Sequence, residues 1–204
     1  MAVLRSTTQT KPDTRLASVL VGTLLAILVS GCSSKPEILP QEAFWQNLSQ
    51  LCGKAYPGRV IADSTQSPVF RDKTLLLHVA ECDEGSVSMP LLIDGRPWAT
   101  LVVSRDEDRL DLEHLHEARP DGDGPPSGYG GPTRGTGTEV SQDFYADEFT
   151  IALDEDAADT VWTIELRPGA VMQYVLRREG TDRRFRAVFD LSRGRPAPTI
   201  PSLR

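Results

Sequence analysis

Residues 74–105 read TLLLHVAECDEGSVSMPLLIDGRPWATLVVSR and contain three short apolar runs. The runs are Thr74–Glu81, Val87–Ile93 and Trp98–Arg105, and the turn residues Asp83-Glu84-Gly85 and Asp94-Gly95 separate them. Runs of this length that are rich in Val, Leu, Ile and Thr are typical of β-strands, and Asp-Gly is a strong signal for a hairpin turn. Because no helical periodicity lies between the runs, this stretch predicts an antiparallel meander.

The same pattern continues towards the C-terminus, in runs at Arg109–Glu117, Thr138–Tyr145, Phe149–Leu153, Thr160–Leu166, Val171–Arg178 and Arg183–Leu191. A meander of about nine or ten strands leaves exposed edges unless it closes on itself. We therefore expect a mainly β domain that forms an up-and-down β-barrel, by analogy calycin-like, with a β-sandwich as the alternative. Pro90 inside a run predicts a bulge or a sheet edge there.

The N-terminus has the layout of a secretory signal. Three basic residues precede an uncharged apolar run, Leu16–Val29. At ~1.5 Å per helical residue this run covers about 21 Å, too short for a hydrocarbon core of about 30 Å. The sequence Val29-Ser30-Gly31-Cys32 that ends it resembles the bacterial lipobox. This resemblance implies that Cys32 carries lipid (palmitate among its acyl chains) and becomes the first mature residue.

The signal divides the chain into residues 1–31, a lipidated tether at 32–40, a single β-rich domain at 41–194 and a disordered Pro-rich tail at 195–204. Removing residues 1–31 leaves 19 basic and 28 acidic residues, a net charge of about −9. This charge argues against nucleic acid as a partner and against polybasic membrane attachment. We expect anchoring by lipid in the bacterial cell envelope. Ser33, where some inner-membrane lipoproteins have aspartate, favours the outer membrane, facing the periplasm.

An amphipathic helix is predicted over Gln41–Leu51, ahead of the first β-run, and Gly53 should end it. Its apolar side chains recur at intervals of three to four residues, at Phe44, Trp45, Leu48 and Leu51. Two cysteines remain after Cys32, and an even pair in an oxidising compartment favours a disulfide. A Cys52–Cys82 bond would join this helix to the sheet.

Two of the three histidines lie on one predicted strand. Alternation over Arg109–Glu117 places Leu110, Leu112, His114 and His116 on the inner face. Histidines two residues apart on a strand lie about 7 Å apart and could share a divalent metal. The candidate third ligands are His78, from the face it shares with Leu76, and Asp121 or Asp123 from the long loop that follows. The alternative is a pair of hydrogen-bonded histidines near the barrel mouth, with no metal and no other cofactor.

Residues 118–137, which follow this strand, contain seven glycines and four prolines. Long loops in compact domains are often functional, and we expect this one to form a mobile flap that brings Tyr129 over the histidines. A second candidate feature is a local positive patch around the last predicted hairpin turn, at Arg177, Arg178, Arg183, Arg184 and Arg186. Such a patch suits a lipid phosphate or an acidic partner, or is a solvated hairpin.

Three groups of segments resemble a family of bacterial secreted proteins and lipoproteins with no established activity: Phe44-Trp45 with Leu51–Tyr56, His114-Leu115-His116 with Tyr129-Gly130-Gly131, and Leu176–Gly180 with Arg183-Arg184-Phe185. The resemblance implies an exported domain and nothing about mechanism. Because the chain lacks a Gly-x-Ser-x-Gly elbow, we expect no enzymatic activity. The expected function is binding of a small or amphipathic ligand or an envelope partner. A metal-dependent enzyme or metal-binding protein that uses His114 and His116 is the alternative.

Overall fold

The computed structural model describes residues 38–106, 109–116 and 126–198, which all belong to one unit, Glu37–Arg204. The expected signal peptide, Cys32, Asp121 and the last six residues lie outside the described part. These ranges contain two α-helices, α1 at Pro40–Ser49 and α2 at Glu148–Leu153. Two short 3-10 helices follow α2 and β11, at Glu155–Asp159 (η1) and Leu191–Arg193 (η2).

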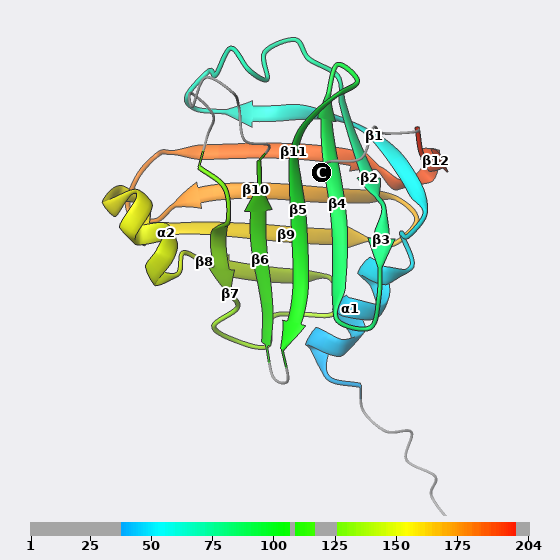
Figure 1. Cartoon of the computed structure of the whole chain (residues 1–204), viewed down its shortest axis with the longest axis horizontal. Helices are drawn as coiled ribbons and strands as arrows, with labels where there is room; N and C mark the ends of the chain where they lie inside the picture. The colour runs from blue at the N-terminus through cyan, green and yellow to red at the C-terminus, as the bar shows by residue number, and fades with distance from the viewer. Residues whose placement is uncertain (1–37, 107–108, 117–125, 199–204) are drawn as a thin grey trace, which may run out of the picture. The chain divides into compact units, whose positions relative to one another are not determined.

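The remaining elements are strands, all paired antiparallel (Figure 1). Their bounds are β1 Lys54–Asp63, β2 Leu75–Val79, β3 Glu81–Cys82, β4 Ser86–Ile93, β5 Arg96–Asp106, β6 Arg109–Leu115, β7 Tyr129–Pro132, β8 Ser141–Tyr145, β9 Thr160–Arg167, β10 Val171–Arg178, β11 Arg184–Asp190 and β12 Arg195–Pro196.

The sheet order is β7-β6-β5-β4-β2-β1-β11-β10-β9-β8, with β3 beside β4 and β12 beside β1. Most neighbours in the sheet are thus neighbours in the chain, with only the two-residue β3 between β2 and β4. The exceptions are the β1–β11 pair, which joins the two halves, and the β1–β12 pair. The outer strands β7 and β8 meet at one bridge, Thr133 with Phe144, and the Asp147 N–H donates to the Gly130 carbonyl over 3.0 Å. The expected mainly β, calycin-like up-and-down barrel is therefore confirmed, in a nearly closed form.

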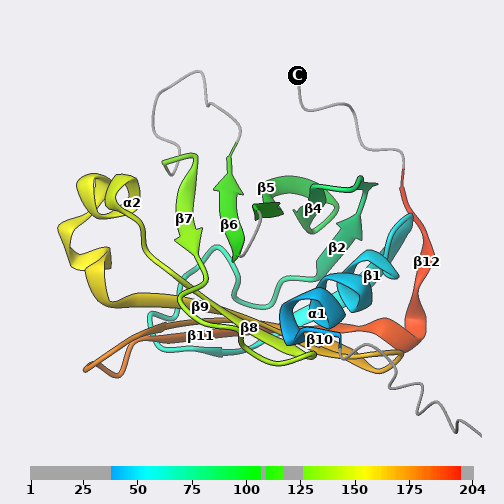
Figure 2. The same cartoon turned by 90° about the horizontal axis from the view of Figure 1, so that it is seen from below.

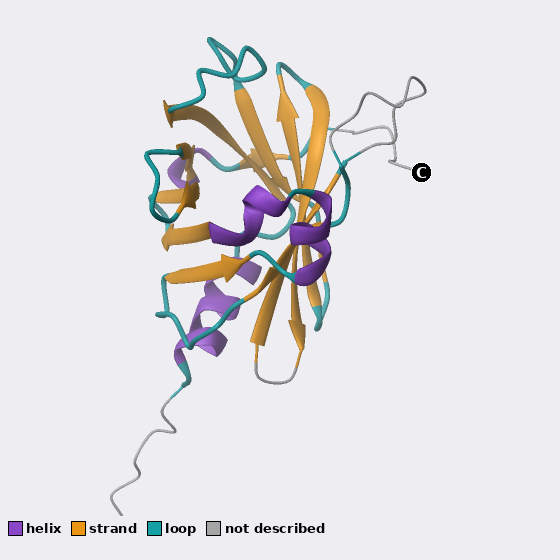
Figure 3. Ribbon diagram, turned by 90° about the vertical axis from the view of Figure 1, so that its left-hand side faces the viewer, coloured by secondary structure: helices purple, strands orange, loops and turns teal. Residues whose placement is uncertain are grey.

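The barrel is flattened, with β2 and β4–β7 in one layer and β8–β11 in the other (Figures 1, 2 and 3). Helix α1 lies against the space between these layers in Figure 2, and its Phe44 and Leu48 are fully buried. Both strand layers contribute inward rows to the same core, including Leu77, Met89, Leu112, Ile164 and Met172. Since a fully buried side chain of this size contributes about 1.5–3 kcal/mol, the core stabilises the barrel from within.

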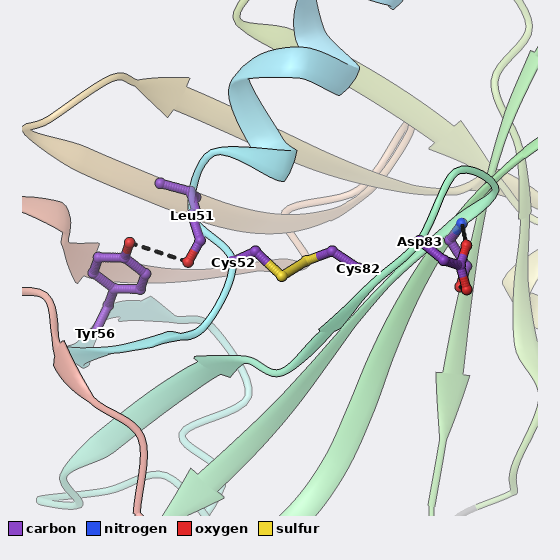
Figure 4. The surroundings of a disulfide bond; sticks show 6 residues. Leu51, Cys52, Tyr56, Cys82 and Asp83 are labelled. Atoms are coloured by element: carbon purple, nitrogen blue, oxygen red, sulfur yellow. Dashed lines mark hydrogen bonds between the residues drawn. A yellow bond between two sulfur atoms is a disulfide. The ribbon is translucent and has the colours of Figure 1, made fainter.

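The expected disulfide is present between Cys52, just after α1, and Cys82 on β3 (Figure 4). It closes a loop with a sequence separation of 30, and chain entropy alone assigns such a crosslink about 3–4 kcal/mol. On the same segment the Tyr56 hydroxyl donates to the Leu51 carbonyl over 3.2 Å. The helix is thus held to the sheet by a covalent bond and by packing.

One predicted strand is wrong. Residues Phe149–Leu153 lie in helix α2. The Asp147 side chain accepts from the Thr150 N–H over 2.7 Å, which is an N-cap, and the Thr150 hydroxyl donates to the buried Gly130 carbonyl over 2.9 Å. These bonds outweigh a strand-like pattern of only five residues. Phe149 and Leu153 remain about half exposed, at 52% and 46%.

Three further differences concern strands that the pattern did not predict. Strand β1 contains Pro57 and Gly58, two residue types that are uncommon inside strands. The strand tolerates Pro57 because this residue lies before the pairing with β11 begins. Strand β7 lies within the stretch expected to be a loop, and β12 lies in the expected tail, where Arg195 pairs with Ala55. The bulge expected at Pro90 is found beside it, between Leu91 and Leu92.

No helix within the described ranges is long and apolar enough to cross a membrane.

Candidate functional site

The inner row of β6 changes from apolar to polar within one strand. Leu110, Leu112 and His114 are all buried, and His114 is only 2% exposed. The next inward residue, His116, lies just beyond the strand and is half-buried. The predicted inner face is therefore correct, but His114 lies in the core of the barrel and is not part of an open mouth.

Both ring nitrogens of His114 have hydrogen-bond partners. Nδ1 lies 3.0 Å from the Tyr129 carbonyl oxygen, and Nε2 lies 2.7 Å from the Tyr174 hydroxyl. Since a carbonyl oxygen only accepts, Nδ1 carries the proton, so Nε2 accepts from the hydroxyl of Tyr174. The imidazole is thereby fixed as one neutral tautomer between β7 and β10.

His116, two residues further along the chain, has the same two kinds of hydrogen-bond partner as His114, a backbone carbonyl and a tyrosine hydroxyl. Its Nδ1 donates to the Trp98 carbonyl over 3.0 Å, and its Nε2 accepts from the Tyr129 hydroxyl over 3.3 Å. Tyr129 therefore serves both histidines, through its carbonyl and its hydroxyl. The structure brings together His114, His116 and Tyr129 as the sequence predicts, and it adds Tyr174 and Trp98.

Burial keeps this cluster uncharged. Desolvation lowers the pKa of His114 to about 4, an effect that the hydrogen bond to Tyr129 only partly offsets. Burial also lowers the pKa of His116 and raises the pKa of Tyr129 to about 12. The pKa of the partly buried Tyr174 is raised well above its usual value, first by burial and then by Tyr129. At neutral pH the cluster consists of neutral imidazoles and neutral phenols.

The described part of the chain provides no third metal ligand beside His114 and His116. The inner row of β2 is Leu75, Leu77 and Val79, so His78 points to the opposite face of the sheet with Leu76. Asp121 and Asp123 lie outside the described residues. Within those residues no three His, Cys, Asp or Glu side chains converge as a metal would need. A metal at His114 would also have to displace the Tyr174 or the Tyr129 hydrogen bond.

Aromatic rings extend the cluster towards one end of the barrel. His114 stacks on Tyr129, with ring centroids 4.5 Å apart and planes at 8°. Tyr129 begins a series of ring-to-ring contacts that passes through neighbouring strands and the β1–β2 loop and ends at His114. The rings between Tyr129 and His114 are, in order, His116, Trp98, Phe70, Phe185 and Tyr174. The sequence pattern could have indicated Tyr174, because alternation places it between Met172 and Leu176 on the inward face of β10. Phe70 carries no such signal, because it lies in a loop.

A cavity of about 250 Å³ lies against this aromatic wall. Its apolar side is lined by Phe70, Tyr129, Tyr174, Leu176 and Phe185. Its polar side is lined by residues at the end of β1, in the β1–β2 loop and at the β10–β11 turn: Asp63, Thr65, Ser67, Arg183 and Arg184. We refer to it as the aromatic cavity.

The β1–β2 connection, residues 64–74, is built against this cavity (top of Figure 1). The Asp63 carboxylate accepts from the N–H groups of Thr65 and Ser67 over 3.0 and 2.9 Å. Phe70 packs on Phe185 with ring centroids 4.9 Å apart. The expected flap at 118–137 is only partly described, and its described part includes β7, which belongs to the barrel wall. The described loop that lines the cavity is therefore 64–74.

The five arginines of the predicted patch divide into two pairs and one separate residue. Arg177 pairs with Asp143 over 2.9 Å, and the Arg178 guanidinium lies 3.5 Å from Asp156. Arg183 and Arg184 line the aromatic cavity. Arg186 lies further along β11, exposed and away from the cavity lining.

The buried His114 predicts a specific pH dependence. Because its pKa falls from 6.5 to about 4 on folding, the unfolded chain binds this proton more readily between those values. Stability is thus complete above about pH 7 and is lost as the pH falls, by about 2.5 kcal/mol at pH 4.5. Urea unfolding at pH 7.5 and pH 4.5 should show this extra loss in the wild type relative to His114→Phe. Equal losses in both proteins would show that His114 is protonated in the folded state.

Comparison with known proteins finds no matching family model and no significantly similar curated protein. The resemblance to bacterial secreted proteins and lipoproteins stays a prediction.

Proposed function

We propose that this chain is a lipid-anchored envelope protein whose barrel domain binds a small ligand with an apolar body in the aromatic cavity. The observation that carries the proposal is the cavity of about 250 Å³ against Phe70, Tyr174 and Phe185. Ligand sites are concave, mostly apolar and provided with a few convergent polar groups, which is the composition of this lining.

The ionisation of the cluster favours binding over catalysis. A nucleophilic or basic tyrosine needs a lowered pKa, but burial raises the pKa of Tyr129 and Tyr174. A histidine acting as a general acid or base works best with a pKa near the operating pH, and burial takes the pKa of His114 to about 4. The hydrogen bonds instead hold the rings in place, which lowers the ordering cost of binding.

The size of the cavity limits the ligand. Its volume of about 250 Å³ corresponds to the liquid volume of about eight water molecules. One aromatic ring with a short substituent, or a short acyl segment, would fill it. The expected lipid at Cys32 would hold the domain at the membrane, and two or more acyl chains are enough for stable anchoring.

A probe that matches this shape is 2-phenylethanol. Titration of the purified full-length chain by calorimetry should give a Kd of about 1 mM, as expected for about nine non-hydrogen atoms at modest ligand efficiency. Leu176→Trp should weaken binding at least tenfold because the indole would occupy the cavity. The matched control is Leu153→Trp on α2, whose side chain is half exposed and does not line the cavity. Equal binding by both variants would refute the proposal.

A further inference from the structure

We propose that the ligand of the aromatic cavity is a small organic anion, whose acidic group pairs with Arg183 and Arg184 while its apolar body lies against Phe70 and Phe185. This inference rests on the proposed function and specifies the charge of the ligand. It follows from the placement of the two arginines, from the state of the nearest carboxylate and from the neutrality of the aromatic wall.

The backbone that carries the two arginines is fixed at the cavity. The Arg184 N–H donates to the Ser64 hydroxyl over 2.9 Å, and the Arg184 carbonyl accepts from the Ser64 N–H over 2.9 Å. The Arg183 N–H donates to the Thr181 hydroxyl over 3.2 Å, and its carbonyl accepts from the Arg178 N–H. The hairpin turn and the β1–β2 loop therefore hold the backbone of both arginines at the polar side of the cavity, and their side chains are exposed.

The charges around the cavity do not cancel. Neither Arg183 nor Arg184 has an ion-pair partner among the described residues, in contrast to Arg177 and Arg178. Among the described residues, Asp63 is the only carboxylate in the lining, and it already accepts hydrogen bonds from its own loop. Two positive charges thus face one negative charge that is otherwise engaged.

The rest of the lining cannot supply the missing negative charge, because Tyr129 and Tyr174 are neutral phenols. An acid entering the cavity would place its apolar part on the rings and its charged oxygens at the arginines. Guanidinium groups match a carboxylate or a phosphate with two parallel hydrogen bonds. Because the mature chain is acidic overall, this selectivity for anions is a local property of the hairpin.

Three probes share one ring and differ in charge: phenylacetate, 2-phenylethanol and 2-phenylethylammonium. Calorimetric titration of the full-length chain should rank them in that order, with phenylacetate about tenfold tighter than the alcohol. The double variant Arg183→Gln, Arg184→Gln should bring the ratio of phenylacetate to alcohol affinity close to one. Arg186→Gln, on the same strand but outside the lining, should keep the tenfold ratio. Added salt should also reduce the ratio, since both arginines are exposed.

Two results would overturn the anion proposal and leave ligand binding itself intact. One is phenylacetate binding no tighter than the alcohol, and the other is an unchanged ratio in the double variant. The proposed function fails separately, if none of the three probes binds. Sedimentation with phosphatidylglycerol vesicles distinguishes another role for the arginines. If the double variant lowers vesicle binding but not the phenylacetate ratio, the arginines serve a membrane surface and the proposal is wrong.

Discussion

Replacing Gly130 with alanine is expected to lower the free energy of unfolding by about 4 kcal/mol or more, or to prevent folding. Gly130 has a φ of +155°, and an added Cβ would lie 1.8 Å from the carbonyl oxygen of Leu112. Neither the β6 backbone nor the β7 backbone can move away without breaking the pairing of Leu112 with Gly131 and of Glu113 with Gly130. Urea unfolding followed by circular dichroism measures the loss.

Gly135→Ala is the matched control, because no atom lies within 4 Å of its added Cβ. It should change stability by less than about 0.5 kcal/mol, as surface substitutions usually do. Gly131→Ala should behave like Gly130→Ala, since its φ is +148° and its added Cβ would lie 2.1 Å from the Tyr145 carbonyl oxygen. A stable, folded Gly130→Ala protein would contradict the β6–β7–β8 closure.

His114→Ala should cost about 3–5 kcal/mol. The substitution removes a side chain that is only 2% exposed, and it leaves the Tyr129 carbonyl without its donor and the Tyr174 hydroxyl without its acceptor. An unsatisfied buried polar group costs about 1–3 kcal/mol, and the vacated ring volume adds a cavity penalty. The strand pattern alone, which places this residue near a barrel mouth, predicts a small cost, and burial overturns that expectation.

His116→Ala provides the comparison, because it removes the same ring from the same row at a half-buried position. Its cost should stay near 1 kcal/mol, since water can replace the lost hydrogen bonds. Chemical denaturation of both variants at pH 7.5 measures the difference. If the two losses were equal, His114 would not be the buried centre of the cluster.

Much of the barrel was predictable because its strands carry their own signals. Alternating runs such as Trp98–Arg105 and Val171–Arg178 face one core and solvent in turn, and their turns are short. Strand β7 was not predictable, because Tyr129-Gly130-Gly131-Pro132 has the composition of a loop. Glycine is required at Gly130 and Gly131 because the backbone carbonyls of Leu112 and Tyr145, which are distant in sequence, lie where a Cβ would be.

The candidate site was predictable only along a single strand. Alternation placed His114 and His116 on the inner face, but the partners of these histidines come from β5, β7 and β10. His78 shows the limit of strand alternation, because its apolar neighbour Leu76 suggested that both side chains face the core, whereas Leu75, Leu77 and Val79 do. The cavity itself lies where the β1–β2 loop contacts the β10–β11 turn. These segments are distant in sequence, so no local sequence pattern predicts their contact.

Intermolecular nuclear Overhauser effects between the full-length chain and phenylacetate would locate the ligand in the barrel. Binding in the aromatic cavity predicts contacts from the ligand ring protons to the side chains of Phe70, Tyr174 and Phe185, and the loss of these contacts in Leu176→Trp. Contacts from bound phenylacetate to other residues, with none to these three rings, would contradict it.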